Sequence, residues 1–288
     1  MLLKTLTVLC LLLASSIAAT DYCKLNCGDT KNIACNSAYV SAKDTIFIYL
    51  DPFGNWKFNF RPVVTYSWGD SCKAQALFSM TKEYQQSLVD VHNKYRNLIA
   101  LGNITPYSPA VRMPKIKWDA DLAYTAEMNV RSCVYGHDSC HNTAKYSNAG
   151  QSIAMMMTVV DWDRNMTTSR LTGLTMGWFN EYKNGKSHGW MDMINQIKAS
   201  DFDSSKPVVG HFTAWVQDRT EAIGCAAVFT TPNYNGKDYG AFILTCNYSF
   251  SNLLGTPVYV AGTTASKCMT GRDATYPGIC SENEVITY

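Results

Sequence analysis

Cysteine content constrains this chain more than any other feature of its sequence. The 288 residues include 11 cysteines, and all except Cys10 lie after residue 20. An even set of ten cysteines in an exported chain is typical of a disulfide framework. Spacing suggests two local pairs, Cys23 with Cys35 and Cys268 with Cys280, and leaves the other pairings open. A zinc ribbon is not favoured, because the chain contains no Cys-x-x-Cys pair.

The N-terminus has the features of an export signal. Lys4 supplies a positive charge, residues 6–13 are apolar, and small residues follow. The apolar stretch is shorter than the roughly 20 residues that a membrane span needs. We therefore expect residues 1–19 to be a signal peptide, cleaved near Ala18 to Thr20. The mature protein is expected to be secreted and extracellular, with no transmembrane segment.

The overall composition is that of an ordinary globular protein. Hydrophobic residues make up 47% of the chain and charged residues 17%, so a sizeable core can form. The net charge of +2 gives no reason to expect nucleic acid or an anionic membrane surface as a partner. No internal repeat is evident. We expect a monomer.

An unusual stretch lies in the cysteine-bound N-terminal extension, which we place at residues 20–78. Residues 45–50 are β-branched and aromatic, and residues 51–55 have the composition of a turn. After the turn, aromatic and polar residues alternate. This pattern predicts a β-hairpin. The aromatic positions of its second strand are Trp56, Phe58 and Phe60.

Three helices are predicted in the middle of the chain. After Ser79, apolar residues recur at steps of three and four, and Gly102 suits the C-terminal end of that helix. Asp119 is the expected N-cap of the second helix. The predicted helical segments are 79–102, 119–133 and 171–182, with a loop over 183–189.

The last third of the chain is rich in β-forming residues. The sequence Asn235-Gly236 between two apolar runs is a strong hairpin signal. Cys225 and Cys246 would then lie on neighbouring antiparallel strands and could pair. Helices followed by strands indicate an α+β fold. The predicted strands are 211–216, 223–230 and 239–248, and residues 251–288 are expected to form a C-terminal tail with one local disulfide.

Several short motifs occur in an order that resembles one protein family. Their order between residues 80 and 248 is similar to that in the CAP superfamily of cysteine-rich secretory, antigen 5 and pathogenesis-related proteins. The segment Asp21-Tyr-Cys-Lys-x-x-Cys27 resembles the insect antigen 5, or venom allergen-like, branch. The motifs are His92-Asn-x-x-Arg96, Cys133-x-x-x-His137-x-x-Cys140, Trp178-x-x-Glu181, Gly210-His211 and Cys246-Asn-Tyr248.

The resemblance implies a disulfide-stapled, three-layer α-β-α sandwich of the CAP/SCP type over residues 79–250. It also implies a complete set of disulfides that uses all ten mature cysteines. One departure is that the segment between Cys35 and Cys72 is longer than in the venom allergens. The implied pairs are Cys23–Cys35, Cys27–Cys140, Cys72–Cys133, Cys225–Cys246 and Cys268–Cys280.

The resemblance also implies a cleft. In many CAP proteins two His and two acidic residues gather there, and the matching positions here are His137, Glu181, His211 and Gln151. Two imidazoles, His137 and His211, would suit a divalent metal such as zinc. At position 151 an amide replaces the usual acid, and an amide cannot act as a general base. We therefore expect no catalytic residue and no required cofactor.

Other motifs are interpreted more simply. His92 and Arg96 are expected to be structural, and His141 and His188 to lie on the surface. Gly185-x-Ser187-x-Gly189 fits a nucleophile elbow in its letters alone, because that motif needs a strand before it and a helix after it. Three sequons predict N-glycosylation at Asn103, Asn165 and Asn247.

Three functional hypotheses follow, in order of preference. The first is a non-enzymatic secreted effector, of the venom, salivary or reproductive-fluid type, that binds an extracellular protein. The second is a carrier of a lipid, sterol or other small ligand, with the apolar run at residues 155–162 as its groove. The third is a metal-dependent hydrolase that uses the cleft.

Overall fold

The protein is seen in a computed structural model that describes residues 20–35, 40–50, 56–158 and 164–287. The predicted signal peptide lies outside the described residues. The helices are α1 (Lys82–Ala100), α2 (Ala120–Val130), α3 (Thr168–Asn180), α4 (Met191–Asn195) and α5 (Gly210–Trp215), with 3-10 helices η1 (Tyr22–Lys24), η2 (Ile33–Cys35), η3 (Glu181–His188) and η4 (Ala199–Phe202). The strands are β1 (Val40–Leu50), β2 (Trp56–Tyr66), β3 (Ala76–Leu77), β4 (Lys117–Trp118), β5 (Gly150–Thr158), β6 (Ala222–Thr230), β7 (Asn233–Tyr234), β8 (Lys237–Asp238) and β9 (Gly240–Tyr248).

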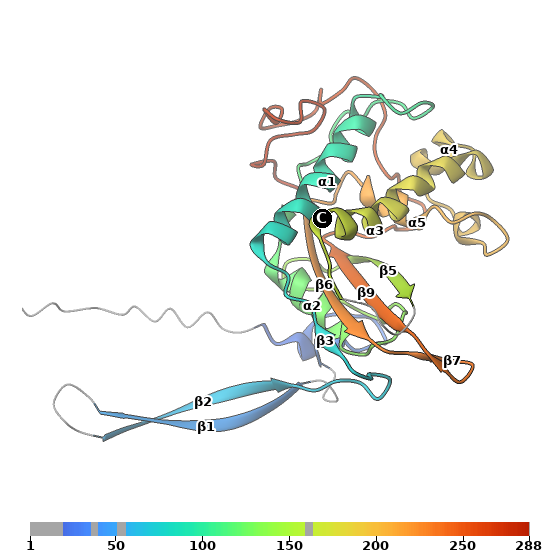
Figure 1. The fold of residues 1–288 in the computed structure, drawn as a ribbon. Helices are drawn as coiled ribbons and strands as arrows, with labels where there is room; N and C mark the ends of the chain where they lie inside the picture. Colours follow the sequence, from blue (N-terminus) through green and yellow to red (C-terminus); the bar gives the residue numbers. More distant parts are fainter. Residues whose placement is uncertain (1–19, 36–39, 51–55, 159–163, 288) are drawn as a thin grey trace, which may run out of the picture.

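The central layer is a sheet in the order β3-β6-β9-β5, and β4 pairs with β6 in parallel. Helix α2 packs on one face of this sheet, and α1, α3 and α5 lie on the other (Figure 1). Strands β6 and β9 are buried on both faces, so alternate residues enter different cores. Phe229 and Phe242 join the core under α1 and α3, whereas Val228 and Ile243 join the core under α2. The predicted three-layer α-β-α sandwich is confirmed.

The first two predicted helices are confirmed, and so are the expected N-cap at Asp119 and the glycine that follows the first helix. The side chain of Thr81 accepts a hydrogen bond from the backbone N–H of Tyr84 at the start of α1. Asp119 accepts from Leu122 N–H at the start of α2. Gly102, just beyond α1, has a φ of +74°, a left-handed conformation that glycine adopts without steric cost.

Two predictions about local structure are wrong. The third helix ends at Asn180, and residues 181–188 form η3 in place of the predicted loop 183–189. The predicted strand 211–216 is helix α5. The Glu181 carboxylate accepts hydrogen bonds from the first backbone N–H groups of α5, and Phe212 and Trp215 are fully buried. Tertiary contacts therefore override the β-like composition of this segment.

The remaining strand predictions hold. Strands β6 and β9 lie within one residue of the predicted segments, and the hairpin at Asn235-Gly236 joins β7 to β8. Strand β5 was not foreseen; it pairs along its whole length with β9, from Gly150 opposite Tyr248 to Thr158 opposite Gly240.

Five disulfides join the cysteine pairs that the family resemblance implies. Cys225 and Cys246 are register partners on β6 and β9, and their Cα atoms are 4.0 Å apart. Two long-range bridges fasten the N-terminal extension to the body of the protein. The pairs are Cys23–Cys35, Cys27–Cys140, Cys72–Cys133, Cys225–Cys246 and Cys268–Cys280.

The hairpin predicted in the extension is present as an antiparallel ribbon of β1 and β2. Its turn, residues 51–55, lies outside the described residues. The ribbon extends away from the sandwich (Figure 1).

The C-terminal segment is more than a tail held by one disulfide. Val258, Tyr259 and Ile279 are fully buried. Backbone hydrogen bonds join this segment to the loop after α1, for example from Cys280 N–H to the Met113 carbonyl at 2.8 Å. The segment therefore completes the core on the side of α1.

Arg96 of α1 is buried and satisfies the carbonyl groups of several loops. Its two terminal nitrogens donate to four carbonyl oxygens at 2.8–3.0 Å. Burial lowers the pKa of Arg96 to about 9, so the guanidinium remains charged at neutral pH. The four carbonyls belong to Pro114, Trp215, Gln217 and Thr220.

His92 lies one helical turn before Arg96 and is fully buried. Its Nδ1 donates to the Leu88 carbonyl at 2.7 Å, its Nε2 accepts from the Tyr248 hydroxyl at 3.0 Å, and its ring stacks on Trp215 at 3.6 Å. Burial lowers the pKa of His92 from 6.5 to about 3, with a further decrease from the charge of Arg96. His92 is therefore a neutral, structural group.

The pKa of His92 predicts a loss of stability in mild acid. As the pH falls below 6.5, the unfolded chain binds a proton at His92, whereas the folded chain does so only near pH 3. Stability at this position therefore falls between these values, by about 2 kcal/mol from pH 7 to pH 5. Urea unfolding at both pH values should show this loss in the wild type. It should be much smaller in His92→Gln, which does not titrate; equal losses in both proteins would contradict the assignment.

Candidate binding cleft

The residues that the resemblance assigns to a cleft form two groups, and the first lies where α3 gives way to η3. His211 Nδ1 donates to Glu181 Oε1 at 2.6 Å, and the backbone N–H groups of His211 and Phe212 approach Oε2 at 3.0 and 3.3 Å. Both carboxylate oxygens are thus engaged by the first turn of α5. Glu181 orients the His211 ring through Nδ1, so Nε2 points to contacts outside this pair.

Trp178 connects this pair to the edge strand of the sheet. The rings of Trp178 and His211 are nearly parallel, with centroids 6.0 Å apart. The indole N–H of Trp178 donates to the Ile153 carbonyl of β5 at 3.2 Å. The Trp-x-x-Glu motif therefore supplies both the residue that orients His211 and the residue that seats α3 on β5.

The second group of expected cleft residues is centred on Gln151 of β5. Its Oε1 accepts from His137 Nδ1 at 2.8 Å. Its Nε2 donates to Asp138 Oδ2 at 2.7 Å and to Asn247 Oδ1 at 3.0 Å. Gln151 therefore acts as acceptor and donor at once, which an amide can do and a carboxylate cannot.

Asp138 is the anionic centre of this half. His141 Nδ1 and Asn129 Nδ2 donate to its two oxygens at 2.8 and 3.0 Å. Burial acts to raise the pKa of Asp138, but hydrogen bonds from His141, Gln151 and Asn129 hold this pKa below its ordinary value. Asp138 is therefore ionised at neutral pH and fixes the orientation of the Gln151 amide.

Sequence reasoning did not identify Asp138, Asn247 or His141 as part of the cleft. The expected surface positions of two histidines are wrong: the side chain of His141 is 13% exposed, and that of His188 is fully buried against Asp201. One sequence signal could have identified Asp138 and His141. Asp138 directly follows the motif residue His137, and His141 comes three residues after Asp138.

A family comparison covers the part of the chain that contains these residues. The profile of CAP, the cysteine-rich secretory protein family, matches residues 89–248, which contain every cleft residue named above. The chain belongs to the CAP family.

The relatives place the protein in the antigen 5-like branch of CAP. Venom allergen-1 of Aedes aegypti is 34% identical over 220 residues, covering 76% of this chain and 80% of the relative. The antigen 5 like allergen Cul n 1 of Culicoides nubeculosus is 37% identical over 158 residues, covering 54% of this chain and 67% of the relative.

Solved structures confirm the CAP fold. BmVAL-1 superposes with a TM-score of 0.53 at 22% identity, and NaASP2 with Zn2+ with a TM-score of 0.50 at 21% identity. Each alignment covers 70% of this chain and 96% of the other. In the described part of the chain, no helix is long and apolar enough to cross a membrane.

The described residues bring together fewer possible zinc ligands than a protein zinc centre uses. Zinc takes three or four protein ligands from Cys, His, Asp and Glu. Among the described residues no three such side chains lie close enough together to hold a metal ion. His137 is paired with an amide, and the Glu181 carboxylate is already engaged by α5.

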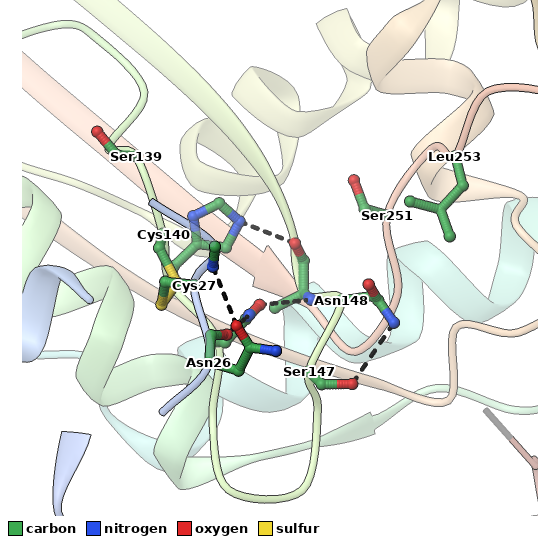
Figure 2. Close-up of a pocket in the computed structure, with 12 residues that line it drawn as sticks. Asn26, Cys27, Ser139, Cys140, Ser147, Asn148, Ser251 and Leu253 are labelled. Carbon is green, nitrogen blue, oxygen red and sulfur yellow. Dashed lines mark hydrogen bonds between the residues drawn. A yellow bond between two sulfur atoms is a disulfide. The ribbon is translucent and has the colours of Figure 1, made fainter. Parts of the chain in front are cut away.

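A polar pocket of about 440 Å³ opens beside the His137–Gln151 half. Figure 2 shows Asn26 and Cys27 of the N-terminal extension on one side, with Ser251 and Leu253 of the segment after β9 opposite. His141 lines the pocket and contacts Asp138, so the pocket and the cleft share one hydrogen-bond network. Most of its polar lining is neutral: Asn26, Ser139, Asn142, Ser147, Asn148 and Ser251.

Two further sequence motifs have simple structural outcomes. Ser187 is exposed in a 3-10 helix that follows a helix, so the strand that a nucleophile elbow needs is missing.

Of the three sequons, Asn103 and Asn165 are exposed, whereas Asn247 is fully buried and donates to Thr125. The folded protein therefore cannot present Asn247 for glycosylation.

The Gln151 geometry predicts that a carboxylate at this position is destabilising. In Gln151→Glu a second negative charge would face Asp138, and the donors to Asp138 and Asn247 would be lost. We expect a loss of about 1–3 kcal/mol at pH 7 in urea unfolding. As a control, Gln196→Glu makes the same charge change at an exposed position and should change stability by less than about 0.5 kcal/mol. Similar losses in both variants would contradict the role assigned to the amide.

Proposed function

We propose that this CAP protein is a secreted, non-enzymatic protein that acts by binding an extracellular partner. The observation that carries the proposal is the amide of Gln151, which occupies the position where an acid would be needed for chemistry. Its two ends bind His137 and Asp138, so the amide is part of a structural network. An amide does not take up a proton at neutral pH.

The rest of the cleft supports the same proposal. Glu181 is the remaining acid of the family pattern, and the backbone of α5 and His211 engage both of its oxygens. A general base must reach the proton that it removes. A carboxylate held in this way is suited to positioning His211. We propose that binding needs no metal.

The exposed surface around the cleft suits recognition of a polar partner. His137 is exposed, and the adjoining pocket presents neutral amide and hydroxyl groups on loops held by the Cys27–Cys140 disulfide. Such groups exchange hydrogen bonds with water for hydrogen bonds with a partner at little electrostatic cost. Rigidly held loops are a common location for binding residues.

Turnover assays test the absence of catalysis. Wild type and Gln151→Glu, both collected from the medium of expressing cells, are incubated with peptide and ester substrates, with EDTA or with added zinc. We expect no turnover in any condition and no change in melting temperature with zinc. Wild-type turnover that His137→Ala and His211→Ala abolish would overturn the proposal. So would an intracellular product with free thiols, because secretion and an oxidised scaffold are part of it.

A small-ligand carrier is the second candidate, and one observation favours it. A cleft of about 440 Å³, lined by Phe78, Met80, Trp118 and Tyr124, lies between α1, α2 and β6. The groove expected at residues 155–162 is less suitable: Met155 and Met156 pack against the cores, and residues 159–163 lie outside the described residues.

Native mass spectrometry separates the two candidates. The binding-protein proposal predicts that the secreted protein carries no co-purifying lipid. Ala123 lines the cleft at the start of α2, so Ala123→Leu would narrow it. A stoichiometric lipid in the wild type that Ala123→Leu reduces would favour the carrier.

A further inference from the structure

The polar pocket that His141 lines is assembled from separate parts of the chain. Its walls come from the N-terminal extension, the loop through Cys140, the loop before β5 and the segment after β9. The Cys27–Cys140 disulfide joins the first two of these parts covalently. The pocket is therefore a product of the tertiary fold, which no single loop could form alone. The lining segments are residues 26–28, 139–142, 147–149, 251 and 253.

Hydrogen bonds between the walls hold the pocket in shape. The Asn142 side chain donates to the Asn26 carbonyl at 3.0 Å and accepts from the Ala149 N–H at 3.1 Å, so it joins two walls. Both ring nitrogens of His141 are engaged, one by Asp138 at 2.8 Å and the other by the Ala149 carbonyl at 3.0 Å. Because these contacts exist before a ligand arrives, little ordering is needed when one binds.

Other polar side chains of the pocket keep hydrogen-bonding capacity for a ligand. In the described part of the chain, the hydroxyl groups of Ser139 and Ser251 contact no other hydrogen-bonding group of the protein. These two serines lie on opposite sides of the pocket (Figure 2). The Asn148 amide reaches only the hydroxyl of Ser147, at 3.5 Å. Hydroxyl and amide groups both donate and accept, so a ligand meets donors and acceptors on more than one side.

The lining favours a ligand without charge. Among the described residues that form the walls, none is Lys, Arg, Asp or Glu, and none is Phe, Tyr or Trp. A phosphate, sulfate or carboxylate group is usually held by Arg or Lys, and an ammonium group by carboxylates or aromatic rings. The apolar part of the lining is small and consists mainly of Leu253, Ala149 and the Cys27–Cys140 disulfide. This leaves a neutral ligand that is rich in hydrogen-bonding groups.

A sugar ring meets these requirements better than a peptide. Its adjacent hydroxyl groups donate and accept at once, and its C–H face can lie on a small apolar surface. A peptide main chain is more often bound along an unpaired strand edge or in an extended groove, whereas loops form this pocket. Its volume of about 440 Å³ suits a small ligand unit, since such pockets span about 300–1,000 Å³.

We propose that this pocket binds a neutral carbohydrate unit, either a free sugar or the end of a glycan on the extracellular partner. The hydroxyl of Ser251 and the amide of Asn148 bind hydroxyl groups of the ring, and Leu253 contacts its C–H face. The inference rests on the binding function proposed above and names the chemical class that is recognised.

Saturation-transfer NMR with the methyl glycosides of mannose, galactose and N-acetylglucosamine tests the pocket. We expect saturable binding of at least one glycoside, with a Kd that stays within about twofold between about 50 and 500 mM NaCl, because no charged side chain lines the site. Asn148→Ala and Ser251→Ala should each raise this Kd about fivefold. Asn283→Ala makes the same change as Asn148→Ala at an exposed position outside the pocket and should leave the Kd unchanged.

Two results would overturn the proposal. One is the absence of binding by all three neutral glycosides. The other is binding that Asn148→Ala and Ser251→Ala leave as strong as Asn283→Ala does. Melting temperatures of the variants show that each is folded. Asn148 is exposed, so its truncation is expected to leave the fold intact and keeps the test valid if the partly buried Ser251 does not tolerate change.

A second experiment separates the two sources of the sugar. The protein is passed over an immobilised glycoprotein with neutral N-glycans, before and after enzymatic removal of these glycans. Binding that is lost with the glycans, and that the free glycoside inhibits, would assign a partner's glycan. Binding of the free glycoside alone would assign a free sugar. Binding that survives glycan removal and that Asn148→Ala weakens would overturn the carbohydrate in favour of a peptide, and the proposed binding function would stand. Turnover in the substrate assays would instead overturn that function without changing the sugar measurements.

Discussion

One buried guanidinium organises the half of the molecule that carries His211. Arg96 donates to four carbonyl groups from segments that are far apart in the sequence. They include Trp215 at the end of α5, Gln217 two residues later and Thr220 in the turn before β6. Removing this charge would leave those carbonyls without partners in a dry interior, which is far more costly than losing one surface contact. Trp215 accepts a hydrogen bond from Arg96 at its carbonyl and stacks its ring on His92. These two contacts fix the C-terminal end of α5. The position of His211 at the near end of α5 follows from it.

At position 151 an amide stands where the family pattern has an acid, and its contacts differ from those a carboxylate would make. Two imidazoles are oriented by neighbours that accept from Nδ1, a carboxylate for His211 and an amide for His137. The amide also bridges to Asp138, which carries the negative charge of this half in a buried position. A charge that is buried and fully hydrogen-bonded stabilises a network and is poorly placed for proton transfer to a substrate. The binding role proposed above therefore rests on the single residue at position 151.

Much of the fold, and part of the cleft, could be predicted from the sequence. Helices α1 and α2 and strands β6 and β9 follow from periodicity and caps, because each pattern agrees with the packing. Helix α5 was assigned as a strand, since its six residues are too few for helical periodicity to show, and its start depends on Glu181, 30 residues earlier. Family motifs identified His137, Glu181 and His211, but no local pattern could show that Asp138 and Asn247 meet Gln151. That contact depends on the pairing of β5 with β9.

The disulfides on either side of the ribbon affect which sequence changes the protein can accept during evolution. Cys35 and Cys72 are tied to partners in different parts of the protein, so the length of the insert between them does not alter either attachment. The fold of the sandwich therefore does not depend on the length or sequence of the segment between Cys35 and Cys72. Residues can be inserted, exchanged or removed at this position while the core folds as before. New surface properties can therefore arise there without a loss of stability in the sandwich.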